Sequence, residues 1–516
     1  MTRCFRDRVA LVAALSGGAL LAAACPAGAD VTLPAVFGDG AVVQRDVPLP
    51  VWGKAAPGEV VTVSFGAKTV RITTGADGRW RAVLPAFAAG GPFELAVQGA
   101  NRVTRKDILI GDVYLCSGQS NMELNLGRAT NGAETISASN DPLLRFFRVA
   151  RAQPAEVADD VRAVWHPSGP STSGGFSAVG YFFGRALRKA EHVPIGLIGS
   201  YVGGTQAQAW TREEALTANP DLKRRYVDTD AAGQARHDQQ MAAYTAALAQ
   251  AKTDGKREPQ KPYNFQRFSS LYNGMIAPLN DFPIRGVLWY QGESNAGDPT
   301  GYAELLPTLI SDWRARRHAP ELPFLVVQLP AFGTNAGGGL AWAELREHQA
   351  ETAGTIPAVG MAVTLDAGTQ HNIHPTDKEP VGERLALLAR KMIYGEALLV
   401  VNGPTYRTLQ IGAGKAVITF DNVGDGLEAR GGTASGIPVS ADTLTGFTVA
   451  GADGKFVPAT ARVTGKDTVE VSASSVAAPK AVRYGFVNFP VVNLWNKNGL
   501  PAAPFRTDTQ TAGEIK

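Results

Sequence analysis

Three short segments of the sequence combine the residue types that acyl-transfer chemistry uses. In the first, Tyr114–Met122, Ser120 stands in a Gly-x-Ser turn directly after an apolar strand. A serine at such a turn is exposed for nucleophilic attack, and the backbone N–H groups beside it can stabilise an oxyanion. The Gly-x-Ser-x-Gly elbow of many hydrolases would need a second glycine where Met122 stands. Spacing alone therefore leaves a purely structural turn open.

The second segment, Trp289–Ala296, also follows an apolar strand. The side chains of Gln291 and Asn295 can donate hydrogen bonds to a developing oxyanion, and Glu293 can accept a proton. Ser294 in the same segment is a rival to Ser120 as nucleophile. The segment can therefore supply either supporting groups or the attacking group itself.

The third segment, Asp366–His374, follows the strand Met361–Leu365. A histidine here can act as a general base if an acidic or carbonyl partner fixes its tautomer. His371 and His374 are three residues apart and could bind a metal, but no matching set of Cys, Asp or Glu accompanies them. We therefore expect no metal and no cofactor.

The elements that must position these segments are apolar strands alternating with helical patterns over residues 111–395. The expected strands are Val113–Cys116, Ile195–Ile198, Val287–Tyr290, Phe324–Gln328 and Gly360–Leu365. This alternation predicts an α/β fold with a parallel sheet covered by helices on both faces. Ligands of such folds sit beyond the carboxyl ends of the strands, where the three segments should meet. Cys116, inside its strand, is expected to be a small core residue.

Two regions rich in short strands flank this α/β region. Residues 30–110 and 396–516 carry strand patterns punctuated by turn residues, which indicates sandwich-like β-modules. Within the α/β region, residues 211–266 are polar and rich in Ala and Gln. They predict a helical insertion over the sheet edge, which either flanks the ligand cleft or is a solvated excursion without function.

The three segments in this order resemble the sialate O-acetylesterase-type carbohydrate esterases, a branch of the SGNH (GDSL-like) hydrolases. The resemblance runs through nearly the whole chain after residue 29. The matching pieces are Phe37–Asp39, Val43–Arg45, Val51–Gly53, Gly111–Val113, Ser117–Met122, Tyr272–Met275, Trp289–Asn295, Ile373–Pro375, Lys378, Val381–Ala386, Asn496, Gly499–Pro501 and Pro504–Arg506. Each piece is short, but the ordered set is specific. It implies an SGNH-type parallel sheet sandwiched by helices and a carbohydrate O-acetylesterase activity.

The resemblance also implies residue roles. Ser120 corresponds to the family nucleophile and His374 to the base. The oxyanion donors would be the Ser120 backbone N–H, the backbone of Gly204, and the side chain of Asn295 with Gln291 as the alternative. Gln119, next to the nucleophile, is a further active-site candidate.

The acid of the triad departs from the family pattern. SGNH enzymes commonly carry Asp three residues before the histidine, or in this branch two before it, and these positions hold His371 and Asn372. Asp366 at the strand end is the first candidate for the acid, and Glu293 is the second. The third alternative is a Ser–His dyad in which a carbonyl or Asn372 orients His374.

The expected partner is an acetylated carbohydrate whose sugar the sequence leaves open. Sialic acid conjugates and plant polysaccharides such as xyloglucan or xylan fragments are both compatible. Trp210 and Tyr290 could form a platform for a sugar ring or pack in the core. A non-catalytic carbohydrate-binding protein is the alternative from another class, because the usual Asp is missing.

Composition argues against two other classes of partner. The chain has 516 residues with 50 Lys plus Arg and 47 Asp plus Glu, a net charge of +3. A balance this close to neutral argues against a protein built to bind nucleic acid or a membrane surface. The oligomeric state is not indicated.

The first 29 residues have the pattern of a secretory signal. Arg3, Arg6 and Arg8 precede an apolar stretch over residues 9–24, and small residues lead to Ala29. We predict cleavage after Ala29 and export to the periplasm. Cys25 could instead be a lipoprotein cysteine.

Overall fold

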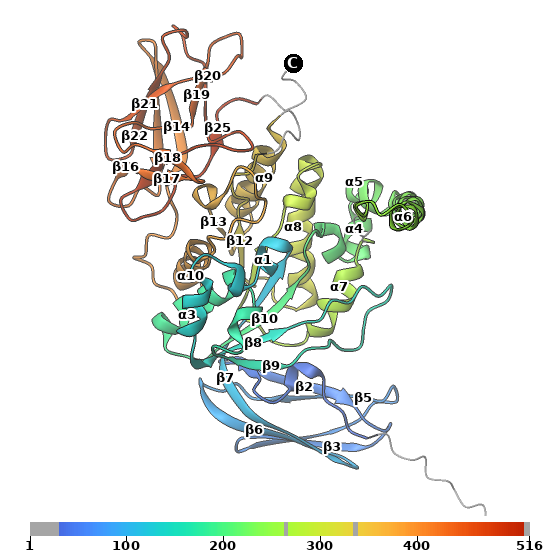
Figure 1. The fold of residues 1–516 in the computed structure, drawn as a ribbon. Helices are drawn as coiled ribbons and strands as arrows, with labels where there is room; N and C mark the ends of the chain where they lie inside the picture. Colours follow the sequence, from blue (N-terminus) through green and yellow to red (C-terminus); the bar gives the residue numbers. More distant parts are fainter. Residues whose placement is uncertain (1–29, 263–266, 334–338, 510–516) are drawn as a thin grey trace, which may run out of the picture.

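The structure is a computed structural model that describes residues 30–262, 267–333 and 339–509 (Figure 1). The predicted signal segment, residues 1–29, lies outside the described residues. In the described part of the chain, no helix has the length and apolar character needed to cross a membrane.

A central sheet forms the middle of the molecule. Its strands run in the order β13-β12-β11-β7-β10-β8-β9. Their bounds are β7 Arg102–Gly118, β8 Asp141–Arg148, β9 Trp165–Ser168, β10 Ile195–Tyr201, β11 Gly286–Tyr290, β12 Phe324–Val327 and β13 Val359–Ala362. Neighbouring strands from β13 to β8 are parallel, and β9 pairs antiparallel with β8. The α/β prediction is therefore confirmed, with one antiparallel strand at the edge.

Helices cover this sheet in two pairs. The pairs are α3 (Ala178–Glu191) with α10 (Glu379–Met392), and α8 (Pro299–Arg316) with α9 (Ala341–Thr355). In Figure 1 the two pairs lie on opposite sides of β12 and β13. Helix α3 starts where Ser177 accepts a hydrogen bond from the Gly180 N–H at 3.0 Å, and its first turns are buried. A capping oxygen followed by an apolar face explains why this helix begins there and packs inward.

Strand β7 joins the N-terminal β-region to the central sheet. Its first half pairs with β6 and β1, and its second half pairs with β10 and β11. The expected boundary at residue 110 falls inside this strand, and the buried apolar core runs without a break from the N-terminal strands into the α/β region. The N-terminal strands are β1 Val42–Gln44, β2 Leu49–Lys54, β3 Val60–Phe65, β4 Lys68–Thr73, β5 Arg79–Leu84 and β6 Gly90–Gln98.

The C-terminal residues form a β-rich region with its own core. Two four-stranded sheets run in the orders β14-β15-β22-β21 and β20-β19-β23-β25. Their buried side chains, such as Ile418, Val469 and Tyr484, form a second cluster that also includes Leu365 of the α/β region. The strands are β14 Thr405–Gly412, β15 Lys415–Asp421, β16 Leu427–Ala429, β17 Gly432–Ala434, β18 Ile437–Val439, β19 Phe447–Ala450, β20 Val457–Pro458, β21 Thr460–Val463, β22 Thr468–Ser472, β23 Ala481–Tyr484, β24 Leu494–Asn496 and β25 Phe505–Arg506.

Short helices complete the α/β region. The segment predicted as a helical insertion consists of α4 (Glu213–Ala218), α5 (Pro220–Leu222), a π-helical turn (Lys223–Val227) and α6 (Asp230–Thr253). It stands at the outer edge of the molecule, beside α8 (Figure 1). The other short helices are α1 Ser120–Glu123, α2 Gly132–Ser137 and α7 Ser270–Met275.

Candidate active site

The three segments meet at the carboxyl ends of the central strands. Ser120 is the first residue of α1, directly after β7. Glu293 begins the turn after β11, the neighbour of β7 in the sheet. His374 lies in the loop between β13 and α10. Parallel strands bring all three to the same edge of the sheet.

Ser120 and His374 are in direct contact. The Nε2 atom of His374 lies 2.8 Å from the Ser120 Oγ atom. A Cβ atom at Gly118, whose φ is +132°, would lie 2.1 Å from the Tyr290 carbonyl oxygen. Glycine is therefore required there, because it lets β7 turn into α1 against the end of β11. This turn presents Ser120 to the histidine.

The imidazole of His374 is suited to accept a proton. Burial lowers the pKa of His374 below its usual 6.5, and the positive charges of Lys378 and Arg128 lower it further. A lowered pKa keeps the ring neutral at pH 7. Neutral imidazole hydrogen-bonded to a serine is the arrangement that activates the hydroxyl as a nucleophile.

The first candidate for the triad acid, Asp366, does not reach His374. Both of its carboxylate oxygens accept hydrogen bonds from the Arg384 guanidinium, each at 2.7 Å. Glu293, the second candidate, accepts a hydrogen bond from Asn121 instead. Among the described residues, no carboxylate is hydrogen-bonded to the imidazole of His374. The strand-end position of Asp366 suggested the acid, but its carboxylate holds α10 through Arg384.

Asn372 holds the backbone of His374. Its Oδ1 atom accepts from the His374 N–H and its Nδ2 atom donates to the His374 carbonyl, both at 2.9 Å. An amide side chain can make both bonds at once because it carries a donor and an acceptor. Of the three alternatives for the acid, the dyad oriented by Asn372 is the one that this geometry favours.

A buried network ties the nucleophile segment to the histidine loop. The Asn121 Nδ2 atom donates to Glu293 Oε1 at 2.6 Å and to the Ile373 carbonyl at 2.9 Å. Its Oδ1 atom accepts from Lys378 Nζ at 2.6 Å. Burial raises the pKa of Glu293 and lowers that of Lys378 to about 7. One amide therefore fixes the residue after Ser120 to the residue before His374.

The predicted side-chain donors of the oxyanion hole are engaged elsewhere. Asn295 accepts from the Ala207 N–H at 2.9 Å and donates to Gln208 at 3.1 Å. The Gln291 amide nitrogen donates to Asn295 at 2.7 Å and to the Thr205 carbonyl at 3.1 Å. Both amides are fully or almost fully buried, and neither lines the cavity at Ser120. They connect loops, and this geometry does not place either of them as a donor beside Ser120.

Gln119 lines the cavity, whereas Asn295 does not. The Gln119 Oε1 atom accepts from the Gln291 amide at 3.2 Å and from the Ser294 N–H at 3.1 Å. Because the oxygen is held by donors, the amide nitrogen is left for other acceptors. Gly204, with φ +71°, also lines the cavity, whereas the Gly203 N–H donates to Glu123 at 2.6 Å.

The cavity in front of Ser120 has a volume of about 760 Å³. The predicted aromatic platform is not part of it, because Trp210 and Tyr290 are fully buried in the core. Trp210 donates to the Thr205 hydroxyl, and Lys378 lies over the Tyr290 ring. Sequence patterns do not separate an aromatic platform from core packing, and here packing accounts for both rings.

The cavity wall includes residues that sequence reasoning did not single out. Arg236, His237 and Gln240 of α6 line the same cavity as Ser120 and His374. The prediction of the insertion offered a role beside the cleft as one of two alternatives. The spacing of these residues on one helical face was the signal that could have found them.

His371, the possible metal partner of His374, is exposed. Among the described residues, no group of three or more His, Cys, Asp or Glu side chains could hold a metal ion. Cys116 is buried, as expected of a core residue, and burial raises the pKa of its thiol.

Comparison with known proteins shows that the chain is similar to esterases of carbohydrates. Residues 110–391 match the family described as carbohydrate esterase, sialic acid-specific acetylesterase. Mouse sialate O-acetylesterase is 32% identical over 415 residues, which cover 72% of this chain and 75% of the mouse protein. The human sialate O-acetylesterase is 31% identical over 408 residues, with 72% of each chain covered.

A solved structure gives the same indication. The crystal structure of a carbohydrate acetylesterase from Xanthomonas citri is 40% identical and has a TM-score of 0.80. The match covers 93% of this chain and 100% of that one. Both Ser120 and His374 fall inside the range that the family model matches.

Proposed function

Since the chain belongs to the sialic acid-specific acetylesterase family of carbohydrate esterases, we propose that it removes acetyl groups from sugar hydroxyls through an acyl-enzyme on Ser120. It is a sialate O-acetylesterase-like carbohydrate acetylesterase. The observation that carries the mechanism is the 2.8 Å contact between His374 Nε2 and Ser120 Oγ at the wall of an open cavity.

The reaction has two acyl-transfer steps. Ser120 Oγ attacks the acetyl carbonyl while its proton passes to His374 Nε2. The tetrahedral intermediate collapses when the bond to the sugar oxygen breaks and His374 protonates that oxygen. Water then attacks the acetyl-serine, gives its proton to His374 and releases acetate, and the proton returns to Ser120.

The oxyanion formed in each step needs donors near Ser120. The Ser120 N–H is the first of α1, and the first N–H groups of a helix have no acceptor within it. We assign this N–H, the Gly204 backbone and the Gln119 amide nitrogen as donors. Gln119 takes the place that the sequence suggested for Asn295, because its oxygen is held from behind.

In this proposal His374 acts as the base without a carboxylate that is hydrogen-bonded to its imidazole ring. A triad acid both orients the histidine and stabilises the imidazolium. In the proposed dyad, Asn372 and Asn121 supply the orientation through the backbone on either side of the ring. Stabilisation of the imidazolium is left to solvent and to the substrate, so the dyad should be a weaker base than a full triad.

Acetate release from a panel of acetylated sugars tests the function. The panel holds 9-O-acetylated N-acetylneuraminic acid, acetylated xylan oligosaccharides and p-nitrophenyl acetate. Wild-type protein should release acetate from at least one of the two sugars, and Ser120→Ala should lose at least about 1,000-fold in kcat. Circular dichroism of Ser120→Ala checks that the fold is kept. If wild type releases no more acetate than the background level of Ser120→Ala, the proposal is contradicted and a carbohydrate-binding protein is favoured.

We further propose that the protein is exported to the periplasm and cleaved after Ala29. Three arginines, an apolar stretch and small residues before Asp30 support this, as in other secretory signals. The cleaved chain would begin at Asp30.

A further inference from the structure

Helix α6 has a composition that packing does not explain. It runs for 24 residues from Asp230 to Thr253, and Ala251 is its one buried residue. A helix with so few buried side chains gains little stability from packing against the core. Its half-buried positions recur three or four residues apart, at Gly233, His237 and Met241. One face is therefore turned toward the body of the protein, and the first half of that face borders the catalytic cavity.

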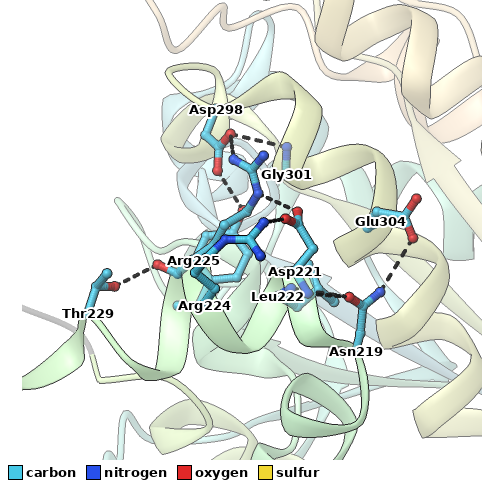
Figure 2. Close-up of polar contacts among 10 residues, drawn as sticks. Asn219, Asp221, Leu222, Arg224, Arg225, Thr229, Asp298, Gly301 and Glu304 are labelled. Atoms are coloured by element: carbon cyan, nitrogen blue, oxygen red, sulfur yellow. Dashed lines mark hydrogen bonds and ion pairs between the residues drawn. The ribbon is translucent and has the colours of Figure 1, made fainter.

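The segment directly before α6, residues 219–229, forms the foot of the helix. It is bound to Asp298, which follows the turn after β11. In Figure 2, Arg225 of the π-helical turn donates to Asp221 and, at 2.8 Å, to Asp298. Asp298 also accepts from the Gly301 N–H at 3.1 Å and so caps α8. Asp298 follows the Glu293–Asn295 turn by three residues. The ion pairs therefore hold the start of α6 in a set position relative to the cavity.

A second set of contacts holds the same foot from the other side. The Asn219 side chain accepts from the Asp221 and Leu222 N–H groups and donates to Glu304 of α8 (Figure 2). Thr229 Oγ1 donates to the Arg225 carbonyl at 2.6 Å, directly before α6 begins. These bonds anchor the segment directly before α6, and the first half of α6 forms a wall of the cavity.

Arg236 is the charged group that this wall presents. Its side chain is exposed and lines the cavity, and it has no ion-pair or hydrogen-bond partner in the part of the chain that the structure describes. Arg225 in the foot and Arg267 beside the start of the same helix both face carboxylates. Gln240 lies one turn after Arg236 and lines the same cavity. Guanidinium and amide groups one turn apart offer several donors to a polyol or a carboxylate.

We propose that Arg236 and Gln240 of α6 bind the sugar part of the substrate and determine specificity. The inference rests on the proposed function of Ser120. The acetyl group is small and must sit at Ser120, so most of the cavity of about 760 Å³ is open to the leaving sugar. The two side chains act on the leaving group and not on the reacting carbonyl. They select sugars over simple acetate esters.

Steady-state kinetics of four single variants test this proposal. Arg236→Ala and Gln240→Ala remove the proposed contacts. Lys252→Ala removes a positive charge from the exposed end of α6, and Gln239→Ala removes an amide from its outer side, so they are matched controls. The probes are the three substrates already named: the neuraminic acid acetate, the acetylated xylan oligosaccharides and p-nitrophenyl acetate.

Arg236→Ala should lower kcat/KM about tenfold or more on the sugar that wild type hydrolyses faster, chiefly through KM, as expected for a lost hydrogen bond from a charged group. Gln240→Ala should lower it about threefold to tenfold. Both variants should stay within about twofold of wild type on p-nitrophenyl acetate, and both controls on all substrates. Unchanged kinetics of Arg236→Ala on both sugars would overturn the proposal, as would an equal loss on p-nitrophenyl acetate. Neither result would affect the role of Ser120, which its own variant tests.

Discussion

At the scale of single residues, the site is a serine and a histidine held together by amides. Ser120 contacts His374, and Asn372 is hydrogen-bonded to the His374 backbone. Asn121 links the segment of the nucleophile to the loop of the histidine. An amide side chain is neutral and offers both a donor and an acceptor, whereas an ionised carboxylate is charged and only accepts. The consequence is that Asp366 can be replaced without removing a partner of the His374 ring.

Asp366→Asn gives the clearest test of that consequence. The carboxylate pairs with Arg384 and not with His374, so kcat should stay within about tenfold of wild type. Loss of a triad acid by the same change costs about 10,000-fold. The unfolding free energy should fall by roughly 1–3 kcal/mol, because a partly buried ion pair is broken. A fall in kcat of about 1,000-fold with the fold intact would make Asp366 the acid after all.

The pH dependence follows from the lowered pKa of His374. The base acts in its neutral form, so kcat/KM should be full at neutral pH and decline only below the ordinary histidine value of 6.5. Arg128→Gln removes one of the charges that lower this pKa, so the acid limb should move to higher pH, most clearly at low salt. Arg71→Gln on the remote strand β4 is the control. An acid limb that moves to lower pH in Arg128→Gln would contradict the assignment of His374.

At the scale of elements, strand ends decide where the chemistry is placed. The apolar runs predicted β7, β10, β11 and β12 because buried parallel strands need continuous apolar side chains. Strand β8 (Asp141–Arg148) was not predicted, since it begins with Asp-Pro and carries two arginines. Arg145 in this strand is nonetheless buried, because it donates to the Gly40 carbonyl and to Asp107. Such long-range partners are not visible in a local pattern.

The same limit explains which site residues the sequence could predict. Ser120 and His374 were predicted because they lie in an ordered set of short segments that resembles one esterase family, although each segment alone is not specific. The roles of Asn295, Gln291, Trp210 and Tyr290 depend on which way each side chain points after folding. Local sequence carries no information about that direction, and all four turn inward. Arg236 was not predicted, because the spacing of Arg236 and Gln240, four residues apart on one helical face, was the one signal that pointed to it.

Gly118→Ala tests the contact between β7 and β11. The new Cβ would lie 2.1 Å from the Tyr290 carbonyl oxygen at a φ of +132°. We expect unfolding free energy to fall by about 3 kcal/mol or more and esterase activity to be lost with it. Gly354→Ala, in the exposed part of α9 with open space around it, should be unchanged or slightly more stable. Wild-type stability and activity in Gly118→Ala would contradict the described strand contact.

At the scale of the whole molecule, N-terminal strands extend the central sheet of the α/β region, and the C-terminal strands form separate sheets. The N-terminal strands share a core with the sheet, whereas the C-terminal strands have a core of their own. The helical insertion adds a wall to the cavity. The catalytic pair thus lies at the edge of the sheet, and in our proposal the insertion supplies the surface that binds the sugar.

Mass spectrometry of the protein recovered from a periplasmic fraction tests the export proposal. The mature chain should begin at Asp30, because the small residues before it form the cleavage site. A chain that begins at a lipid-modified Cys25 would replace this prediction with a lipoprotein anchor. A chain that keeps residues 1–29 would contradict export by this signal.

Covalent labelling tests the central claim most directly. A fluorophosphonate reacts with a serine that a neighbouring base has activated. The protein is labelled, digested and analysed by peptide mass spectrometry. The account predicts a single adduct on the peptide that contains Ser120, and its loss in His374→Ala. An adduct on Ser294, or labelling of Ser120 that persists in His374→Ala, would contradict the Ser120–His374 mechanism.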